Sequence, residues 1–248
     1  MIIDFHTHVD EAVAFGWIDP PEKIVALLDE AGIDRAVCMT YVDLPGIDPQ
    51  ALEYLASAVT RFPDRLIGFV RLNPNHRREA ADALRRAVEE HGFRGVKLHP
   101  TTTLAHPAGE ATVELMRQCG ELGVPVLFHC GDDPYTTPQA VALGAREAPD
   151  TAVVMGHMGG YFHVDDAIAA AERYPNLYLE TSAMPYPGKI AEAVARVGAA
   201  RVVFGSDGPG CNPALEVQKV RILGLPTEDE RMVLYGTAAG LLRLEAPS

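Results

Sequence analysis

Two histidines near the start of the chain are spaced for joint metal binding. His6 and His8 occupy alternate positions in the segment Ile3-Asp4-Phe5-His6-Thr7-His8, which opens with an apolar run. Successive side chains of a β-strand point to opposite faces, so residues two apart project to the same side. Two imidazoles on one side can bind the same cation. An H-x-H pair by itself is nevertheless a weak indication of a metal site.

Three further side chains of metal-binding type come at the ends of apolar runs. They are His129, His157 and Asp207, and each stands where a strand is expected to end. Any one of them is explained equally well as a polar residue in a turn. Because all three occur together with the histidine pair, a shared site becomes the better interpretation. That interpretation requires an architecture in which distant strand ends meet.

The sequence predicts such an architecture. Eight short apolar segments rich in β-branched residues read as buried strands, and their starts recur roughly every 30 residues, the length of one βα unit. They are Met1–His6, Arg35–Thr40, Leu66–Leu72, Gly95–His99, Pro125–His129, Ala152–His157, Leu177–Thr181 and Arg201–Gly205. Nearly continuous apolar strands are typical of a parallel sheet covered by helices on its faces.

Amphipathic stretches lie between the predicted strands. The clearest cover residues 24–31, 81–88 and 190–197, with apolar residues at helical spacing, and a glycine follows each of them. Eight βα units in one chain of 248 residues favour an α/β fold of the (β/α)₈ TIM-barrel class, a single domain over 1–248. An open, doubly wound sheet has the same periodicity and remains the alternative. The chain contains no glycine-rich phosphate-binding motif, so a nucleotide-binding function lacks its main support.

Composition narrows the class of partner. The chain is 48% hydrophobic and 22% charged, as in ordinary globular proteins. Its 21 basic and 34 acidic residues give a formal net charge of −13. An acidic surface disfavours nucleic acid and anionic membranes, because both need a positive field. We therefore expect a small-molecule substrate and neither a nucleic-acid nor a membrane partner; a homodimer is compatible with the sequence.

The cysteines and the amino-terminal segment bear on the compartment. Four cysteines are scattered without a C-x-x-C pair, which predicts reduced thiols and neither a disulfide framework nor a structural zinc site. No apolar run approaches the length of a membrane span, and the first residues do not have the pattern of a secretory signal. We expect a cytoplasmic protein.

Several phrases of the chain together resemble the amidohydrolase superfamily of metal-dependent barrels. The superfamily pattern consists of His6-x-His8, a later His129, His157 and a terminal Asp207. Four phrases, at residues 3–8, 95–100, 156–160 and 204–209, are similar to its amidohydrolase-related (type 2) branch, which includes the aminocarboxymuconate-semialdehyde decarboxylase type. The resemblance spans nearly the whole chain, with the motifs in the expected order. It implies a divalent metal held by His6, His8, His129 and Asp207.

The resemblance also implies roles at the reacting centre. Asp207 and His157 are the expected catalytic residues, Asp207 as metal ligand and proton acceptor and His157 as a polarising or proton-transfer group. Mixed imidazole and carboxylate ligands suit zinc first, with manganese, iron or cobalt as alternatives. Such an ion leaves a position for water and polarises a substrate oxygen.

Three more residues are candidates for substrate binding. Lys97 and His99 lie on one side of the fourth predicted strand, and Arg71 ends the third. Lys97 is expected to bind a substrate carboxylate or to pair internally; related enzymes with two metals use a carboxylated lysine there as a bridge, so the metal count stays open. Arg71 suits a carboxylate or an internal ion pair equally well. His99 either lines the pocket or packs ahead of Pro100.

Two reactions fit this set of residues. The first is hydrolysis of an amide, lactone or ester of a small, carboxylated molecule by metal-activated water. The alternative is nonoxidative decarboxylation on the same scaffold, with Arg71 or Lys97 holding the carboxylate. A phosphoesterase barrel and a TatD-type deoxyribonuclease also begin with H-x-H but lack matching partners later in the chain. A barrel without metal that serves as a binding protein is the non-enzymatic alternative.

Overall fold

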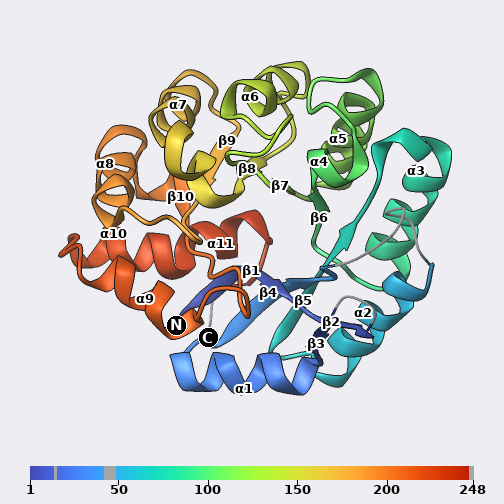
Figure 1. The fold of residues 1–248 in the computed structure, drawn as a ribbon, viewed down its shortest axis with the longest axis horizontal. Helices are drawn as coiled ribbons and strands as arrows, with labels where there is room; N and C mark the ends of the chain where they lie inside the picture. Colours follow the sequence, from blue (N-terminus) through green and yellow to red (C-terminus); the bar gives the residue numbers. More distant parts are fainter. Residues whose placement is uncertain (14–15, 42–48, 246–248) are drawn as a thin grey trace.

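Eight parallel strands form the centre of the protein in a computed structural model, which describes residues 1–13, 16–41 and 49–245. Each predicted strand is confirmed, and helices surround the strands in a ring (Figure 1). In sheet order the strands are β1 (Ile3–His8), β4 (Arg35–Met39), β5 (Leu66–Arg71), β6 (Gly95–Leu98), β7 (Val126–Phe128), β8 (Val153–Met155), β9 (Leu177–Glu180) and β10 (Val202–Val203).

The sheet closes between its first strand and the segment that follows its last. Phe5 N donates to Phe204 O at 2.9 Å, and Asp207 N donates to His6 O at 2.7 Å. A parallel bridge between Thr7 and Gly208 continues this seam. The barrel prediction is therefore confirmed and the open-sheet alternative is wrong. Closure also places the end of β1 beside Asp207, although about 200 residues separate them in sequence.

Eleven α-helices lie among the described residues, and most of them cover the outside of the barrel. Six begin at a proline, which fits the first helical turn because its missing N–H has no partner there. The predicted stripes fall in α1 (Pro21–Ala31), α3 (Arg78–Arg85) with the π-turn after it, and α8 (Pro187–Val197). The others are α2 (Pro49–Arg61), α4 (Pro100–Thr103), α5 (Glu110–Leu122), α6 (Pro138–Glu147), α7 (Gly160–Arg173), α9 (Pro213–Arg221), α10 (Thr227–Arg231) and α11 (Thr237–Leu241).

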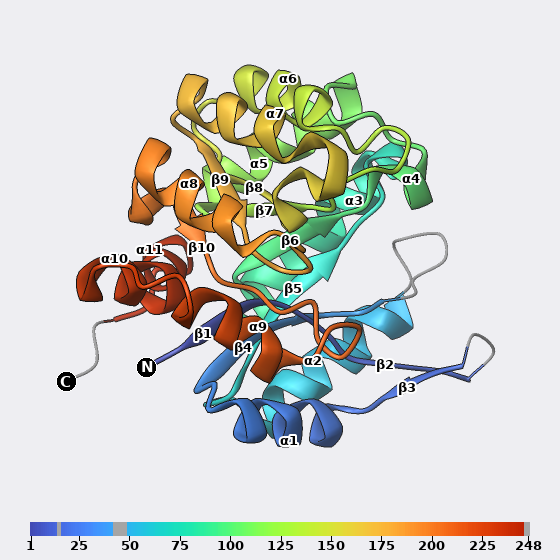
Figure 2. The same cartoon turned by 60° about the vertical axis from the view of Figure 1, so that its left-hand side comes forward.

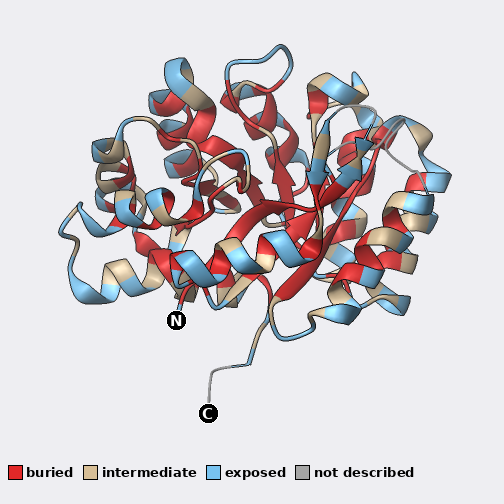
Figure 3. Ribbon diagram, turned by 60° about the horizontal axis from the view of Figure 1, so that its bottom comes forward, coloured by how far each residue is buried: buried red, intermediate tan, exposed pale blue. Residues whose placement is uncertain are grey.

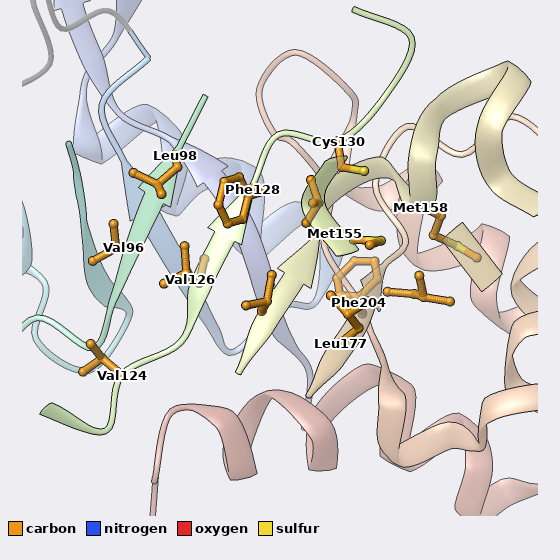
Figure 4. Close-up of a cluster of buried hydrophobic side chains, with 14 of the residues drawn as sticks. Val96, Leu98, Val124, Val126, Phe128, Cys130, Met155, Met158, Leu177 and Phe204 are labelled. Atoms are coloured by element: carbon orange, nitrogen blue, oxygen red, sulfur yellow. The ribbon is translucent and has the colours of Figure 1, made fainter. Parts of the chain in front are cut away.

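Strand alternation divides the core into two layers. Val126 and Phe128 of β7 point toward the helices, whereas Leu127 packs inside the barrel (Figure 4). The eight barrel strands are almost entirely buried, and the helices that surround them are buried mainly on their inner faces (Figure 3). The same alternation directs Lys97 of β6 inward between two outward residues, Val96 and Leu98. Polar side chains can thus reach the barrel interior only at inward-facing positions.

A β-bulge in β1 decides which way its histidines face. The pairing with β4 shifts register between Asp4 and Thr7. Phe5 packs in the inner core, and the next residue, His6, also faces the interior, where it meets Lys97. A bulge inserts one extra residue and re-aims the side chains beyond it. His6 and His8 remain on one side, as predicted, with their rings 5.1 Å apart.

The segment after β1 contains a hairpin that the sequence did not predict. Strands β2 (Asp10–Ala12) and β3 (Trp17–Asp19) pair antiparallel and extend away from the barrel (Figure 2). Trp17 lies on this hairpin, close to the mouth of the barrel. In the part of the chain that the structure describes, no helix is long and apolar enough to cross a membrane.

Candidate metal centre

The seam of the barrel brings together three of the predicted metal ligands. Asp207 Oδ1 lies 3.1 Å from His8 Nε2 and 3.4 Å from His6 Nε2. One ligand atom from each of the three residues lies within 4.8 Å of the other two. His6 is fully buried and Asp207 is partly exposed, so the group opens to one side. Two imidazoles and a carboxylate in this arrangement form an open site of the kind that binds zinc or another transition metal.

The charge state of this group suits a cation. Burial lowers the pKa of His6, and the positive charge of Lys97 lowers it further. Burial alone would raise the pKa of Asp207, but the neighbouring imidazoles of His6 and His8 outweigh it, and the pKa of this carboxyl is lowered. A metal ion needs neutral imidazoles and an ionised carboxylate as ligands. The residues present therefore fit a divalent ion.

Glu180, at the end of β9, fixes the orientation of His6. His6 Nδ1 donates to Glu180 Oε2 at 3.0 Å, and both side chains are fully buried. With its proton on Nδ1, the imidazole presents the lone pair of Nε2 to the cavity. The hydroxyl of Ser182 donates to the same carboxylate at 2.8 Å. This pairing fixes the tautomer of His6 and holds its ring in place.

His129 and His157 are adjacent in the cavity wall, and one nitrogen of each ring faces the other. His157 Nε2 lies 3.2 Å from His129 Nδ1, and the His157 ring is 5.2 Å from the ring of His6. The other nitrogen of each ring is tied elsewhere: His129 Nε2 to Asp133 at 3.1 Å and His157 Nδ1 to Ser182 Oγ at 2.9 Å. If those tied nitrogens carry the protons, the two facing nitrogens present lone pairs. A proton or a cation satisfies such a pair.

His129 does not join the tight group of His6, His8 and Asp207. Its ligand atom falls instead within 4.8 Å of His99 and Asp133. The His99 and His129 rings stack with centroids 4.1 Å apart. Its predicted role as fourth ligand of the metal consequently stays a prediction.

The histidines described above and Asp207 line one cavity of about 130 Å³. All eight site residues predicted from the sequence line this cavity, and two others, Tyr41 and Thr102, complete its wall. The lining residues are His6, His8, Tyr41, Arg71, Lys97, His99, Thr102, His129, His157 and Asp207. The carboxyl ends of barrel strands supply most of these side chains, which is where catalysis occurs in this fold. The larger hollow between α2 and α3 lies away from this cluster, although Arg71 lines both.

Lys97 is the most deeply buried cation in this cavity wall. Its Nζ lies 2.8 Å from His6 Nε2, and only 2% of the residue is exposed. Burial lowers the pKa of Lys97 to about 8, although the carboxylates of Asp207 and Glu180 oppose that shift. Because this pKa still lies above 7, the amine stays mostly protonated near neutral pH. Its direct contact with a predicted ligand shows that Lys97 faces the reacting centre.

Arg71 and His99 also line the cavity, close to Lys97 in the fold: Arg71 pairs with Lys97 across neighbouring strands, and His99 follows it by two residues. Arg71 donates to the carbonyl oxygen of Tyr41 and to Thr102 Oγ1, the latter at 3.0 Å. Burial lowers the pKa of His99 to about 3, so this ring is neutral. Its Nδ1 is buried without a hydrogen-bond partner in the described part of the chain. A substrate oxygen that accepted a hydrogen bond from this nitrogen would satisfy it.

The chain matches the model of a known family over residues 3–244, nearly its whole length. That family is described as amidohydrolase. The chain belongs to the amidohydrolase family. The predicted resemblance to the amidohydrolase-2 branch is thereby confirmed.

Solved structures share the fold of this amidohydrolase at low sequence identity. One is 2,6-dihydroxybenzoate decarboxylase from Rhizobium, with 17% identity, 99% of each chain covered and a TM-score of 0.80. A dihydroxybenzoic acid decarboxylase from Polaromonas, with bound manganese and the inhibitor 2-nitroresorcinol, has 18% identity, coverage of 99% and 98%, and a TM-score of 0.78. The 5-carboxyvanillate decarboxylase from Sphingomonas paucimobilis has 15% identity, coverage of 98% and 99%, and a TM-score of 0.77.

Aromatic side chains wall one side of the amidohydrolase site. Trp17 of the hairpin stacks on Tyr41 with ring centroids 3.9 Å apart. Tyr41 in turn meets the His8 ring edge-on at 5.1 Å. The wall links the unexpected hairpin to a predicted metal ligand. It suits the flat face of a small apolar or aromatic molecule.

Three residues that support the site carry little signal in the sequence. Asp4 accepts from the backbone N–H groups of His6 and Ser206 at 3.0 and 2.8 Å, across the seam of the barrel. Burial raises the pKa of Asp4 to about 8. Ser182 and Asp133 contact His157 and His129 directly. Their only sequence signal is proximity to a strand end, which many polar residues share.

Proposed function

We propose that the protein is a metal-dependent nonoxidative decarboxylase that acts on a small carboxylated molecule. The observation that carries this proposal is the position of Arg71 and Lys97, two buried cationic side chains in the wall of the same cavity as His6, His8 and Asp207. A carboxylate that leaves as CO₂ has to be bound in every substrate of a decarboxylase, whereas a hydrolase needs these two cations only when its substrate carries a carboxylate as well. The likeness to several decarboxylases supports the same choice over hydrolysis.

In this proposal His6, His8 and Asp207 hold one divalent ion, with His129 as the further ligand. The ion, when bound, supplies Lewis-acid polarisation of a substrate oxygen. Zinc was the expectation from the ligand types, and the manganese in related structures makes Mn²⁺ an equal candidate. Arg71 and Lys97 hold the carboxylate, and the Trp17 and Tyr41 rings bound the flat body of the substrate.

The reaction needs a proton at the carbon that loses CO₂. The carbon–carbon bond breaks, its electron pair stays on the substrate, and that carbon gains a proton from the enzyme. His157 and Asp207 are the proposed proton-transfer groups, because both line the cavity; His157 holds the proton, and the ionised Asp207 accepts one only in passing. His99 lines the same cavity and is proposed to contact the substrate.

The test is a panel assay on protein loaded separately with Mn²⁺, Zn²⁺ or Co²⁺. Carboxylated aromatics such as 2,6-dihydroxybenzoate and 5-carboxyvanillate are compared with aryl esters and lactones, with CO₂ and hydrolysis products measured in parallel. We expect CO₂ from at least one carboxylated aromatic, and one deuterium at the vacated carbon when the reaction runs in D₂O. Hydrolysis of an ester or lactone without CO₂ release from any acid would overturn the proposal in favour of the hydrolase.

A further inference from the structure

The turn that presents His157 adopts a strained backbone. His157 has φ 59° and ψ 15°, and the next residue, Met158, has φ 49° and ψ 30°. Both residues therefore lie in the left-handed region of backbone conformation, which residues other than glycine rarely occupy. Two such residues in succession cost free energy and persist only when the surroundings hold them. Something in the structure must stabilise this turn.

Two carboxylates hold the turn at its two ends. On the inner side, Glu180 Oε2 accepts from the backbone N–H of His157 at 3.3 Å. On the outer side, Asp132 accepts from the backbone N–H groups of Tyr161 and Phe162 at 2.9 and 3.0 Å, one with each carboxylate oxygen. These two N–H groups lie in the first turn of α7, where no intrahelical acceptor exists and negative charge is favoured. Asp132 thus caps α7 from another loop.

Asp132 lies in the loop that also carries His129. The loop follows β7, and Asp132 is three residues after His129. Its neighbour Asp133 accepts from His129 Nε2 at 3.1 Å. Asp132 therefore ties the loop of His129 to the helix that begins after His157. This connection preserves the contact between the two rings, in which His129 Nδ1 lies 3.2 Å from His157 Nε2.

Gly160 makes room for this tie. It has φ +71°, and a Cβ at this position would lie 2.6 Å from Asp132 Oδ2. Any other residue would push the carboxylate away from the N–H groups that it caps. Gly160 and Asp132 therefore act together to cap α7, although they come from the loops that follow two different strands.

We propose that Asp132 is a positioning residue that sets the relative placement of His129 and His157. It touches neither substrate nor metal, and it acts by clamping the strained turn to the β7 loop. The role in metal binding rests on the proposed function, whereas the placement of the two rings does not. Loss of the clamp lets the turn relax, so the two facing nitrogens move apart.

The first experiment measures metal affinity in the cobalt-loaded enzyme. We expect Asp132→Ala to raise the dissociation constant for Co²⁺ about 10- to 100-fold, the usual effect of losing a group that orients a ligand, and to shift the visible Co²⁺ spectrum. Asp132→Asn keeps one acceptor oxygen and should give a smaller change in the same direction. Asp165→Asn is the matched control, because Asp165 is also in α7 but pairs with Lys189 on the surface. Its affinity and spectrum should equal those of the wild type.

The second experiment needs no metal. Long-range ¹H–¹⁵N spectra of the imidazoles in the metal-free protein should change for His129 and His157 in Asp132→Ala and in Gly160→Ala, with His8 unchanged. If Asp132→Ala does not fold, Asp132→Asn carries the test. Unchanged His129 and His157 signals in a folded variant would refute the positioning role. Failure of the wild type to bind any metal would instead sink the proposed function and leave this result standing.

Discussion

At the scale of single residues, the cavity separates ligands from the groups that orient them. His6, His8 and Asp207 converge on one point, and Glu180 and Ser182 hold His6 from behind. Their burial means that no bulk water competes for these hydrogen bonds. Mutations at the two kinds of position should therefore have different consequences.

Removal of a proposed ligand should abolish turnover without unfolding the protein. Asp207→Asn and His129→Ala change side chains that line the cavity and that lie outside the apolar layers of the core. We expect at least about a 10³-fold loss of kcat, as in sites that lose an electrostatic contact to the transition state. Far-ultraviolet circular dichroism should stay that of the wild type. Normal turnover in either variant would refute its assigned role.

Removal of the carboxylate behind His6 should weaken the metal without destroying the site. Glu180→Gln keeps the shape of the side chain but loses the charge that fixes the proton on His6 Nδ1. We expect a loss of metal affinity of about 10- to 100-fold. Competition with a coloured chelator measures it. Glu172→Gln is a suitable control, since Glu172 pairs with Arg196 on the outer surface; equal affinities for Glu180→Gln and this control would contradict the expectation.

At the scale of elements, the barrel depends on close approach between neighbouring strands and rings. Gly95 begins β6, and a Cβ there would overlap the Phe69 ring of β5. Phe69 belongs to the inner core and packs edge-on against Phe5 of β1. The absence of a side chain at Gly95 thus allows a large aromatic ring to fill the barrel.

Gly95→Ala should therefore lower the free energy of unfolding. Because the Phe69 ring is fully buried, it cannot move away without disturbing its neighbours, and we expect a loss of about 1–3 kcal/mol. Urea denaturation of the metal-free protein measures it. Gly188→Ala is the control, because a Cβ at Gly188 in α8 meets nothing within 4 Å. A variant Gly95→Ala as stable as Gly188→Ala would contradict this account of the packing.

At the scale of the whole molecule, a fall in pH changes the free energy of unfolding through buried groups whose pKa values are shifted in opposite directions. Burial raises the pKa of Asp4 to about 8 and lowers that of His99 to about 3. As pH falls, the folded state takes up a proton at Asp4 before the unfolded chain does, which stabilises it. At His99 the unfolded chain takes up the proton first, near pH 6.5, which destabilises the folded state.

Comparison of one variant with the wild type isolates the histidine contribution. For metal-free His99→Asn, the stability relative to wild type should rise by about 1.6 kcal/mol in total as pH falls from 6.5 to 5, because the slope reaches its limit of about 1.4 kcal/mol per pH unit only well below pH 6.5. Chemical denaturation at several pH values measures this difference. A difference independent of pH would show that His99 is not held neutral in the folded protein.

Much of the fold could be predicted because it depends on local patterns. Alternation along each strand, helical stripes and terminal glycines repeat within a few residues, so all eight strands and the three clearest helices were identified. The strand-end positions of His129, His157 and Asp207 followed from the same patterns. The β2–β3 hairpin was missed, because its strands of three residues each are too short to show a period.

The sequence by itself determined the type of barrel and the chemical groups at its carboxyl rim. Only the tertiary structure decided how those groups meet: the seam that places Asp207 beside His6, the bulge in β1, and the contact of His6 with Glu180, 174 residues away. Such contacts depend on closing the barrel, and closure links positions whose separation follows no period in the chain. Residue types reveal which ligands are available, whereas three-dimensional packing decides which nitrogen of each ring faces the cavity.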